Sequence, residues 1–206
     1  ENQGLLDFGG NGGNTRLYYR ELIARFGHHL ALNWNLGEEI GDWSKNFDGR
    51  KSMPLFPSER QSVTQYIYDT DPYHHHMVIH NGDWFDSIYV DQSKLTGASL
   101  QTNKSDFRRV NSQTKRVIDE SIAAGKIWAV ACDEPGDASN ALITDGEDPE
   151  QFNDITNGLW GHMLAGGWGT EWYFGYKHPH SDLTCEDFRS RDLFWDMGKI
   201  CIDFFK

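Results

Sequence analysis

Two segments of this sequence end in glutamates that directly follow an apolar run. The first begins at Leu30 and ends in the adjacent pair Glu38 and Glu39, and the second begins at Ile127 and ends at Glu134. Buried strands that each end in an acid are the arrangement from which a parallel barrel builds a two-carboxylate site. Such a site cleaves glycosidic bonds, so the spacing predicts an enzyme that acts on carbohydrate.

Retaining hydrolysis requires one protonated carboxyl group at the leaving oxygen and one ionised carboxylate at the anomeric carbon, about 5–5.5 Å apart. Different surroundings can separate the pKa values of the two groups. We assign Glu39 as the acid/base and Glu134 as the nucleophile, and Glu38 is the second candidate for the acid/base role. A lone glutamate is usually a solvated surface charge. Two acids placed alike after apolar strands favour catalysis instead.

Other side chains near the predicted strand ends suit sugar binding. Asp133 precedes Glu134 and is either a supporting hydrogen-bond acceptor or a turn residue. His80 ends a further apolar run, where it orients a carboxylate, binds a sugar hydroxyl or has a structural role. Aromatic faces also stack on sugar rings, although core packing is the default for each one alone. The aromatic candidates for substrate binding are Trp34, Trp84, Trp172 and Tyr173.

Composition limits the class of partner. The formal charge of −12 argues against nucleic acid and against an anionic membrane surface, because both select lysine and arginine. A chain of 206 residues with 38% hydrophobic content can form one folded domain, and its eight tryptophans favour a carbohydrate ligand. No apolar run approaches the length of a membrane span. We expect a secreted or periplasmic protein with a carbohydrate substrate and with neither nucleic acid nor membrane as partner.

The sequence indicates neither a metal nor a cofactor. His74, His75 and His76 are consecutive, and consecutive side chains rarely converge on one ion. The acidic segment from Asp145 to Asp148 resembles calcium ligands in composition only, without the twelve-residue loop pattern. The three cysteines include no CxxC pair, and no GxGxxG or Walker-type loop follows a predicted strand.

Periodicity and capping signals predict helices and strands that alternate along the chain. The predicted helices cover about 15–26 with Asn14 as N-cap, 57–69, 84–93, 106–124, 148–163 and 184–205. The predicted strands cover about 30–35, 77–80, 98–101, 127–132 and 171–174. This alternation specifies parallel βαβ units. An eight-stranded barrel needs about 250 residues, so the chain is either the later part of a barrel or an open doubly wound sheet.

The segments Tyr18–His29 and Trp34–Glu39 resemble the retaining glycoside hydrolases of clan A. The nearest resemblance is to the apiosidase-like branch, whose members are also described as collagen-binding. It implies a (β/α)8 TIM barrel in which residues 1–206 are the C-terminal portion of one catalytic domain, from about strand four to strand eight. The missing strands would come from the parent chain or from another chain, and without them the barrel would expose a raw edge.

The resemblance also implies roles for individual residues. The acid/base ends strand four and the nucleophile ends strand seven, at the positions of Glu39 and Glu134, while His80 ends strand five. The usual Asn-Glu pair of the clan is replaced here by Glu38 and Glu39, so the acid/base lies between these two. Counting from Trp34 places the acid at Glu39. We expect a retaining glycoside hydrolase acting on a polysaccharide or its side chains, and the alternative is a non-catalytic carbohydrate- or matrix-binding barrel.

Overall fold

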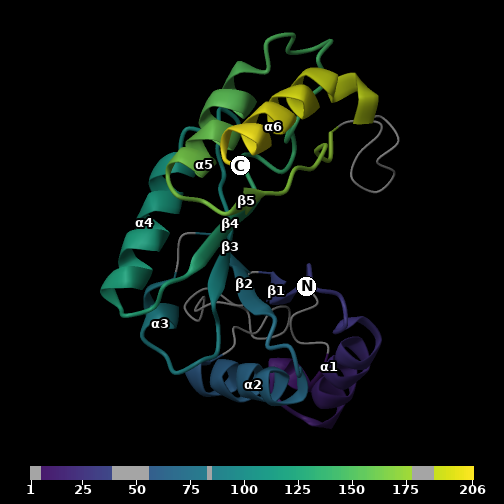
Figure 1. The fold of residues 1–206 in the computed structure, drawn as a ribbon, viewed down its shortest axis with the longest axis vertical. Helices are drawn as coiled ribbons and strands as arrows, with labels where there is room; N and C mark the ends of the chain where they lie inside the picture. The colour runs from purple at the N-terminus through teal and green to yellow at the C-terminus, as the bar shows by residue number, and fades with distance from the viewer. Residues whose placement is uncertain (1–5, 39–55, 83–84, 178–187) are drawn as a thin grey trace. The chain divides into compact units, whose positions relative to one another are not determined.

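The computed structural model describes residues 6–38, 56–82, 85–177 and 188–206 (Figure 1). The chain divides into two compact units. The first unit comprises residues 1–99 and 120–128, and the second comprises residues 100–119 and 129–206.

The described strands form a five-stranded parallel sheet in the order β1-β2-β3-β4-β5. Their bounds are β1 Asn33–Glu38, β2 His76–Asn81, β3 Gly97–Gln101, β4 Ala129–Glu134 and β5 Gly169–Thr170. Each strand neighbours the strand that precedes or follows it in the sequence, and helices alternate with the strands. The predicted α/β class with a parallel sheet is confirmed.

In the first unit, helices α1 (Gly13–Phe26) and α2 (Pro57–Thr70) lie side by side (Figure 1). The side chain of Asp7 accepts hydrogen bonds from the backbone N–H of Thr15 (2.8 Å) and from Asn14 Nδ2 (3.0 Å) at the start of α1. The N-cap residue is Gly12, so the prediction of Asn14 as the cap is wrong. The Asp7 carboxylate from the preceding turn instead accepts from the N–H of Thr15, the third residue of the helix, which is one of the N–H groups that lack a partner within a helix.

The core of the first unit contains residues from α2, β2 and the short helix α3 (Asp86–Tyr89). Ile67, Ile79 and Ile88 have no exposed surface. Burial of both faces of a parallel strand explains the apolar run Met77–Ile79 within β2. α3 is shorter than the predicted helix over 84–93, and residues 83–84 lie outside the described part of the chain.

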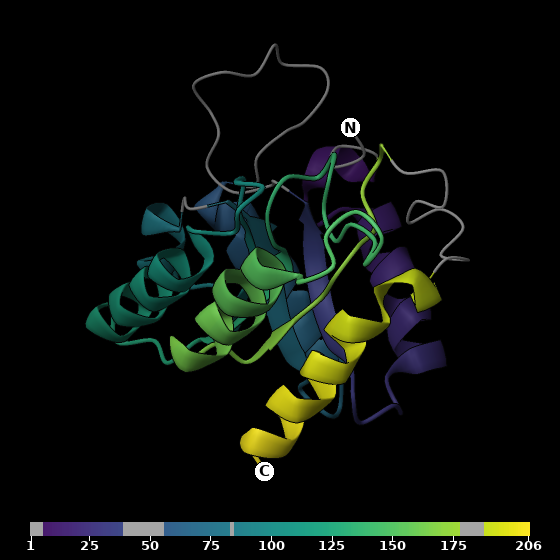
Figure 2. The same cartoon turned by 90° about the horizontal axis from the view of Figure 1, so that it is seen from above.

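In the second unit, helix α6 (Asp192–Phe204) packs along the π-helix η2 (Asp154–Trp160) and its continuation α5 (Gly161–Leu164), as Figures 1 and 2 show. A cluster of buried residues, Leu142, Leu159, Phe194 and Cys201, fills this contact. The 3-10 turn η3 (Phe188–Arg191) precedes α6. Free Cys132 is fully buried in β4.

Three helices begin later than predicted, and one of them is α6, which begins at Asp192 after η3, whereas the predicted helix covered 184–205. Helix α4 spans Val110–Ala123, because Phe107 has a positive φ of 54° and ends a turn in which its N–H bonds to the carbonyl of Lys104. The helix predicted from Asp148 begins at Phe152, after Gln151 with a φ of 47°. The strand predicted over 171–174 lies two residues earlier, as β5. Among the described residues, no helix is both long and apolar enough to span a membrane.

Candidate functional site

Two predicted catalytic carboxylates occupy the final positions of strands. Glu38 is the last residue of β1, and Glu134 is the last residue of β4. Both strands thus end at an acid, as predicted, but β1 lies about three residues later than the predicted strand over 30–35, and Leu30 is 87% exposed. Glu39 and Trp84 lie outside the described residues. The approach of the Glu39 and Glu134 carboxyl groups therefore stays a prediction.

The turn after Glu134 is held by hydrogen bonds within the second unit. The carbonyl of Glu134 accepts from the N–H of Thr102 at 2.9 Å, and the N–H of Gly136 donates to Thr102 Oγ1 at 2.7 Å. Gly136 has a φ of 82°, and a Cβ there would lie 2.4 Å from the ring of Phe107. Only glycine fits both the conformation and the space. The turn therefore directs the chain away from β4 directly after the half-buried Glu134.

In the first unit, His80 lies opposite Glu38. An irregularity in the pairing of β1 and β2 after Asn35 brings Glu38 into register with His80, and Gly37 within it has a φ of 133°. The His80 ring is 8% exposed, and its Nδ1 is 2.8 Å from Ser99 Oγ. The register therefore places His80 beside Glu38, near the ends of β1 and β2.

The aromatic candidates that the structure describes make contacts within their own units. Trp34 is 6% exposed, and its Nε1 donates to Asp71 Oδ2 at 2.9 Å. Trp172 is half-buried and packs on Phe107 and Phe194, with ring centroids 5.4 and 4.4 Å away. These contacts are typical of core packing, which leaves little aromatic surface of Trp34 for a sugar ring.

Asp133 and Tyr173 are both half-buried. Asp133 is the penultimate residue of β4, and the carbonyl of Tyr173 accepts from the N–H of Leu142 at 3.0 Å. Their roles in substrate binding stay predictions.

The three consecutive histidines have separate partners. The His75 ring lies between Asp71 Oδ2 (2.7 Å from Nδ1) and the carbonyl of His29 (2.9 Å from Nε2). His74 stacks on Tyr68, and His76 Nδ1 bonds to Thr96 Oγ1. Within the described ranges, no group of three His, Cys, Asp or Glu side chains is placed to hold a metal ion.

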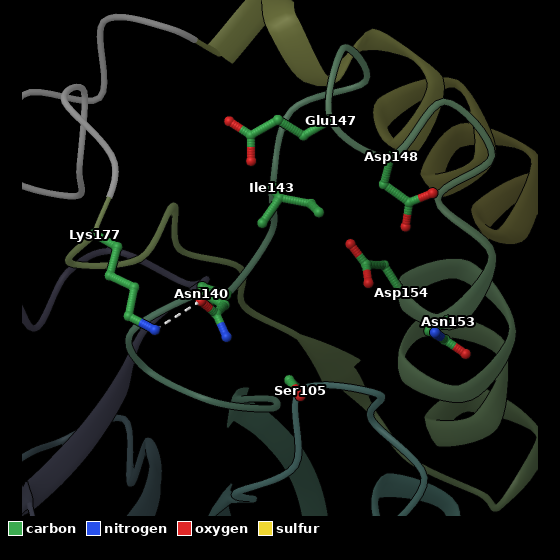
Figure 3. Close-up of a pocket in the computed structure, with 9 residues that line it drawn as sticks. Ser105, Asn140, Ile143, Glu147, Asp148, Asn153, Asp154 and Lys177 are labelled. Carbon is green, nitrogen blue, oxygen red and sulfur yellow. Dashed lines mark hydrogen bonds between the residues drawn. The ribbon is translucent and has the colours of Figure 1, made fainter.

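The second unit contains a pocket of about 570 Å³, which Figure 3 shows. Ser105 comes from the segment after β3, Asn140 and Asp148 come from the segment after β4, and Lys177 follows β5. The pocket is thus built from segments that leave the carboxyl ends of strands, where α/β proteins place their ligand sites. We call it the acidic pocket, because Glu147, Asp148 and Asp154 all line it.

Asp154 is the most perturbed carboxyl group of the acidic pocket. It is 4% exposed, and its Oδ2 has no hydrogen-bond partner in the described part of the chain. Burial, and then the negative charge of Asp148, raise the pKa of Asp154 to about 7. Asp148 itself accepts a hydrogen bond from the N–H of Gln151 at 3.2 Å through Oδ1. Figure 3 shows Asp148 and Asp154 next to one another in the lining of the pocket.

The sequence did not single out Asp154 as a functional residue. The acidic composition of residues 145–148 is the one available signal, and the sequence predicts a helix that begins at Asp148. Because the helix begins four residues later than predicted, at Phe152 instead of Asp148, the intervening turn carries Asp148 toward the pocket. The π-helix then begins with Asp154.

The substitution Asp154→Asn should stabilise the protein at alkaline pH. The folded pKa of about 7 exceeds the ordinary value of 3.8, so between these values the folded protein binds more protons than the unfolded chain. Its free energy of unfolding therefore falls as the pH rises through this window. Asparagine mimics the neutral acid. The advantage of the variant should be absent below the window and reach at most about 4 kcal/mol above it.

Urea unfolding at about pH 4 and pH 8 measures this effect. Glu150→Gln is the matched control, because Glu150 is exposed in the same segment and loses the same charge. An equal gain for Asp154→Asn at both pH values would contradict the assignment.

Comparison of this chain with protein-family models, with curated proteins and with solved structures finds no significant match.

Proposed function

We propose that this protein is a retaining glycoside hydrolase that acts on a polysaccharide or its side chains. One observation carries the proposal: β1 and β4 both end at a glutamate, Glu38 and Glu134. Parallel strands direct their carboxyl ends to one edge of a sheet, where barrel enzymes place their catalytic residues. Two acids at that edge are the minimum that glycoside hydrolysis needs.

The strand order supports a barrel. A doubly wound sheet reverses its strand order at a switch point, whereas a barrel adds each strand beside the previous one. The order β1-β2-β3-β4-β5 contains no reversal. We therefore assign residues 1–206 to the C-terminal portion of a (β/α)8 catalytic domain, with β1 as its fourth strand and β4 as its seventh.

In the proposed reaction, Glu39 donates its proton to the glycosidic oxygen while the Glu134 carboxylate attacks the anomeric carbon. The glycosidic bond breaks, the leaving group departs as an alcohol, and an ester forms between the sugar and Glu134. Glu39, now ionised, removes a proton from water, which attacks the same carbon and releases Glu134. Glu38 takes this acid/base role if Glu39 does not.

Neighbouring groups would support these steps. Asp133 is placed beside the nucleophile, and His80, in register with Glu38, suits orienting the acid/base or binding a sugar hydroxyl. Trp34, Trp84, Trp172 and Tyr173 complete the proposed substrate-binding set. The reaction requires neither metal nor cofactor, and we propose a secreted or periplasmic location.

Covalent trapping tests the proposal. A panel of 2,4-dinitrophenyl 2-deoxy-2-fluoroglycosides is incubated with the intact protein, and the mass of the protein is measured. The fluorine slows both formation and hydrolysis of the glycosyl-enzyme, whereas the good leaving group speeds its formation, so the covalent intermediate accumulates. We expect one added sugar, and peptide mapping should place it on Glu134. Glu134→Gln should not be labelled, and Glu150→Gln should be labelled normally.

The other outcomes separate the competing functions. Hydrolysis of the matching unfluorinated glycosides without any label indicates an inverting enzyme, whose carboxyl groups lie about 6.5–9.5 Å apart. Binding of polysaccharide with neither label nor hydrolysis indicates the non-catalytic carbohydrate- or matrix-binding barrel. A label on a residue other than Glu134 contradicts the assignment of the nucleophile.

A further inference from the structure

The acidic pocket is lined by more carboxylates than cationic side chains among the described residues. Glu147, Asp148 and Asp154 line it, and Lys177 is the one cation among its described lining residues. Lys177 Nζ donates to Asn140 Oδ1 at 3.3 Å, away from Asp148 and Asp154 in Figure 3. Asp148 and Asp154 are close enough for the negative charge of one to raise the pKa of the other, and Lys177 is directed elsewhere among the described lining residues.

Asp154 independently indicates a ligand. Its side chain is buried and aimed into the pocket, and Oδ2 is left without a hydrogen-bond donor among the described residues. A buried polar atom that lacks a partner costs free energy, and native proteins satisfy most such atoms with protein, water or ligand. A cation placed between Asp154 and Asp148 would satisfy Oδ2 and remove the repulsion between the two carboxylates.

The size and lining of the pocket favour an organic cation over a metal ion. The described residues include no group of three His, Cys, Asp or Glu side chains placed to bind a metal. A volume of about 570 Å³ is within the range of small-molecule sites and exceeds the space of a bare ion. Ser105 and Asn153 add a hydroxyl and an amide to the lining, and both groups hydrogen-bond to sugar hydroxyls.

We propose that the acidic pocket binds an amino sugar, with its protonated amine held between Asp148 and Asp154. That the ligand is a sugar rests on the proposed function, whereas that it carries an ammonium group rests on the two carboxylates. The pocket follows β3, β4 and β5 directly and comes from the same unit as Glu134. It would select substrates that carry a free amine over acetylated or acidic sugars.

Calorimetric titration tests the inference with two probes that differ in charge. The first is a β-1,4-linked glucosamine trisaccharide, and the second is its fully N-acetylated counterpart, both titrated at about pH 6.5 and low salt. We expect the free amine to bind at least about tenfold more tightly. Asp154→Asn and Asp148→Asn should each weaken binding of the free amine by about tenfold or more, whereas Glu150→Gln should change it less than about twofold.

Equal binding of the two trisaccharides, no binding of either, or an equal loss in Glu150→Gln would overturn the inference. The unfolding measurements on Asp154→Asn show whether that variant is folded. Titration of Glu134→Gln separates the two proposals. If the wild type and Glu134→Gln both bind the free amine tightly, the amine site is present. If the fluoroglycosides also leave the wild type unlabelled, the proposed catalysis fails independently of that site.

Discussion

Replacing Glu134 by glutamine is expected to lower kcat on any accepted glycoside by at least about 10³-fold. Glutamine has nearly the same shape as glutamate but carries no charge and cannot attack the anomeric carbon. The backbone bonds that fix this position, from Thr102 N–H to the Glu134 carbonyl and from Gly136 N–H to Thr102 Oγ1, do not involve the substituted side chain. The loss should therefore arise in the chemical step, with the fold retained. Steady-state kinetics and a thermal unfolding curve measure the two effects.

A second substitution distinguishes a nucleophile from a merely structural acid. Glu134→Ala leaves space for a small anion, so azide should restore activity and yield a glycosyl azide of inverted configuration. Activity of Glu134→Gln within about tenfold of the wild type would exclude Glu134 as the nucleophile.

The variants Glu38→Gln and Glu39→Gln show which of the two glutamates is the acid/base. The true acid/base variant should keep its activity on dinitrophenyl glycosides and lose it on glycosides with poor leaving groups.

The end of β4 could be predicted to within two residues, because an apolar run has a visible limit in the sequence. Glu134 follows Cys132 and Asp133 and precedes Pro135, which cannot donate to a ladder, so β4 had to end there. The beginning of the same strand was less well defined. The prediction began β4 at Ile127, but Ile127 is 90% exposed and the strand begins at Ala129. Burial, which the sequence does not report, decides which apolar residue belongs to the strand.

The acidic pocket could not be predicted, because it depends on backbone conformations that residue type does not dictate. Phe107 and Gln151 have φ values of 54° and 47°, which non-glycine residues rarely adopt. Tertiary contacts stabilise both turns: the Phe107 ring lies against Gly136, and Gln151 Nε2 donates to the carbonyl of Ile143 at 2.8 Å. Because of these two turns, both helices begin later than the sequence predicts. They also place Asp154 at the start of η2, where burial changes its chemistry.

Arg60 is a second case in which the sequence conceals the role of a residue. It lies in the first turn of α2, in a polar stretch that is typical of a solvated helix face. The guanidinium is instead 0% exposed, and its Nε donates to Asp91 Oδ2 at 2.7 Å across 31 residues of sequence. Asp91 Oδ1 also accepts from Ser93 N–H at 2.9 Å and lies 3.6 Å from Lys126 Nζ. This buried network ties α2 to the segment before β3.

Arg60→Met is therefore expected to lower the free energy of unfolding by about 3–5 kcal/mol. Methionine replaces the apolar part of the arginine but leaves the Asp91 carboxylate buried without its closest cation. The cost arises mainly from that uncompensated charge, since the intact pair gains little over an apolar replacement. Urea unfolding at about pH 7 measures the loss, with Arg25→Met as the control, because Arg25 pairs with Glu21 on the exposed face of α1.

The double variant Arg60→Met/Asp91→Asn tests this explanation. Asparagine removes the charge and keeps an oxygen for the Ser93 N–H, so the double variant should be more stable than Arg60→Met alone. If the second substitution makes the protein still less stable, the loss in Arg60→Met does not come from the buried charge of Asp91. The packing of the arginine stem in the core of the first unit would then be the cause. A loss of less than about 1 kcal/mol in Arg60→Met would contradict the buried pair itself.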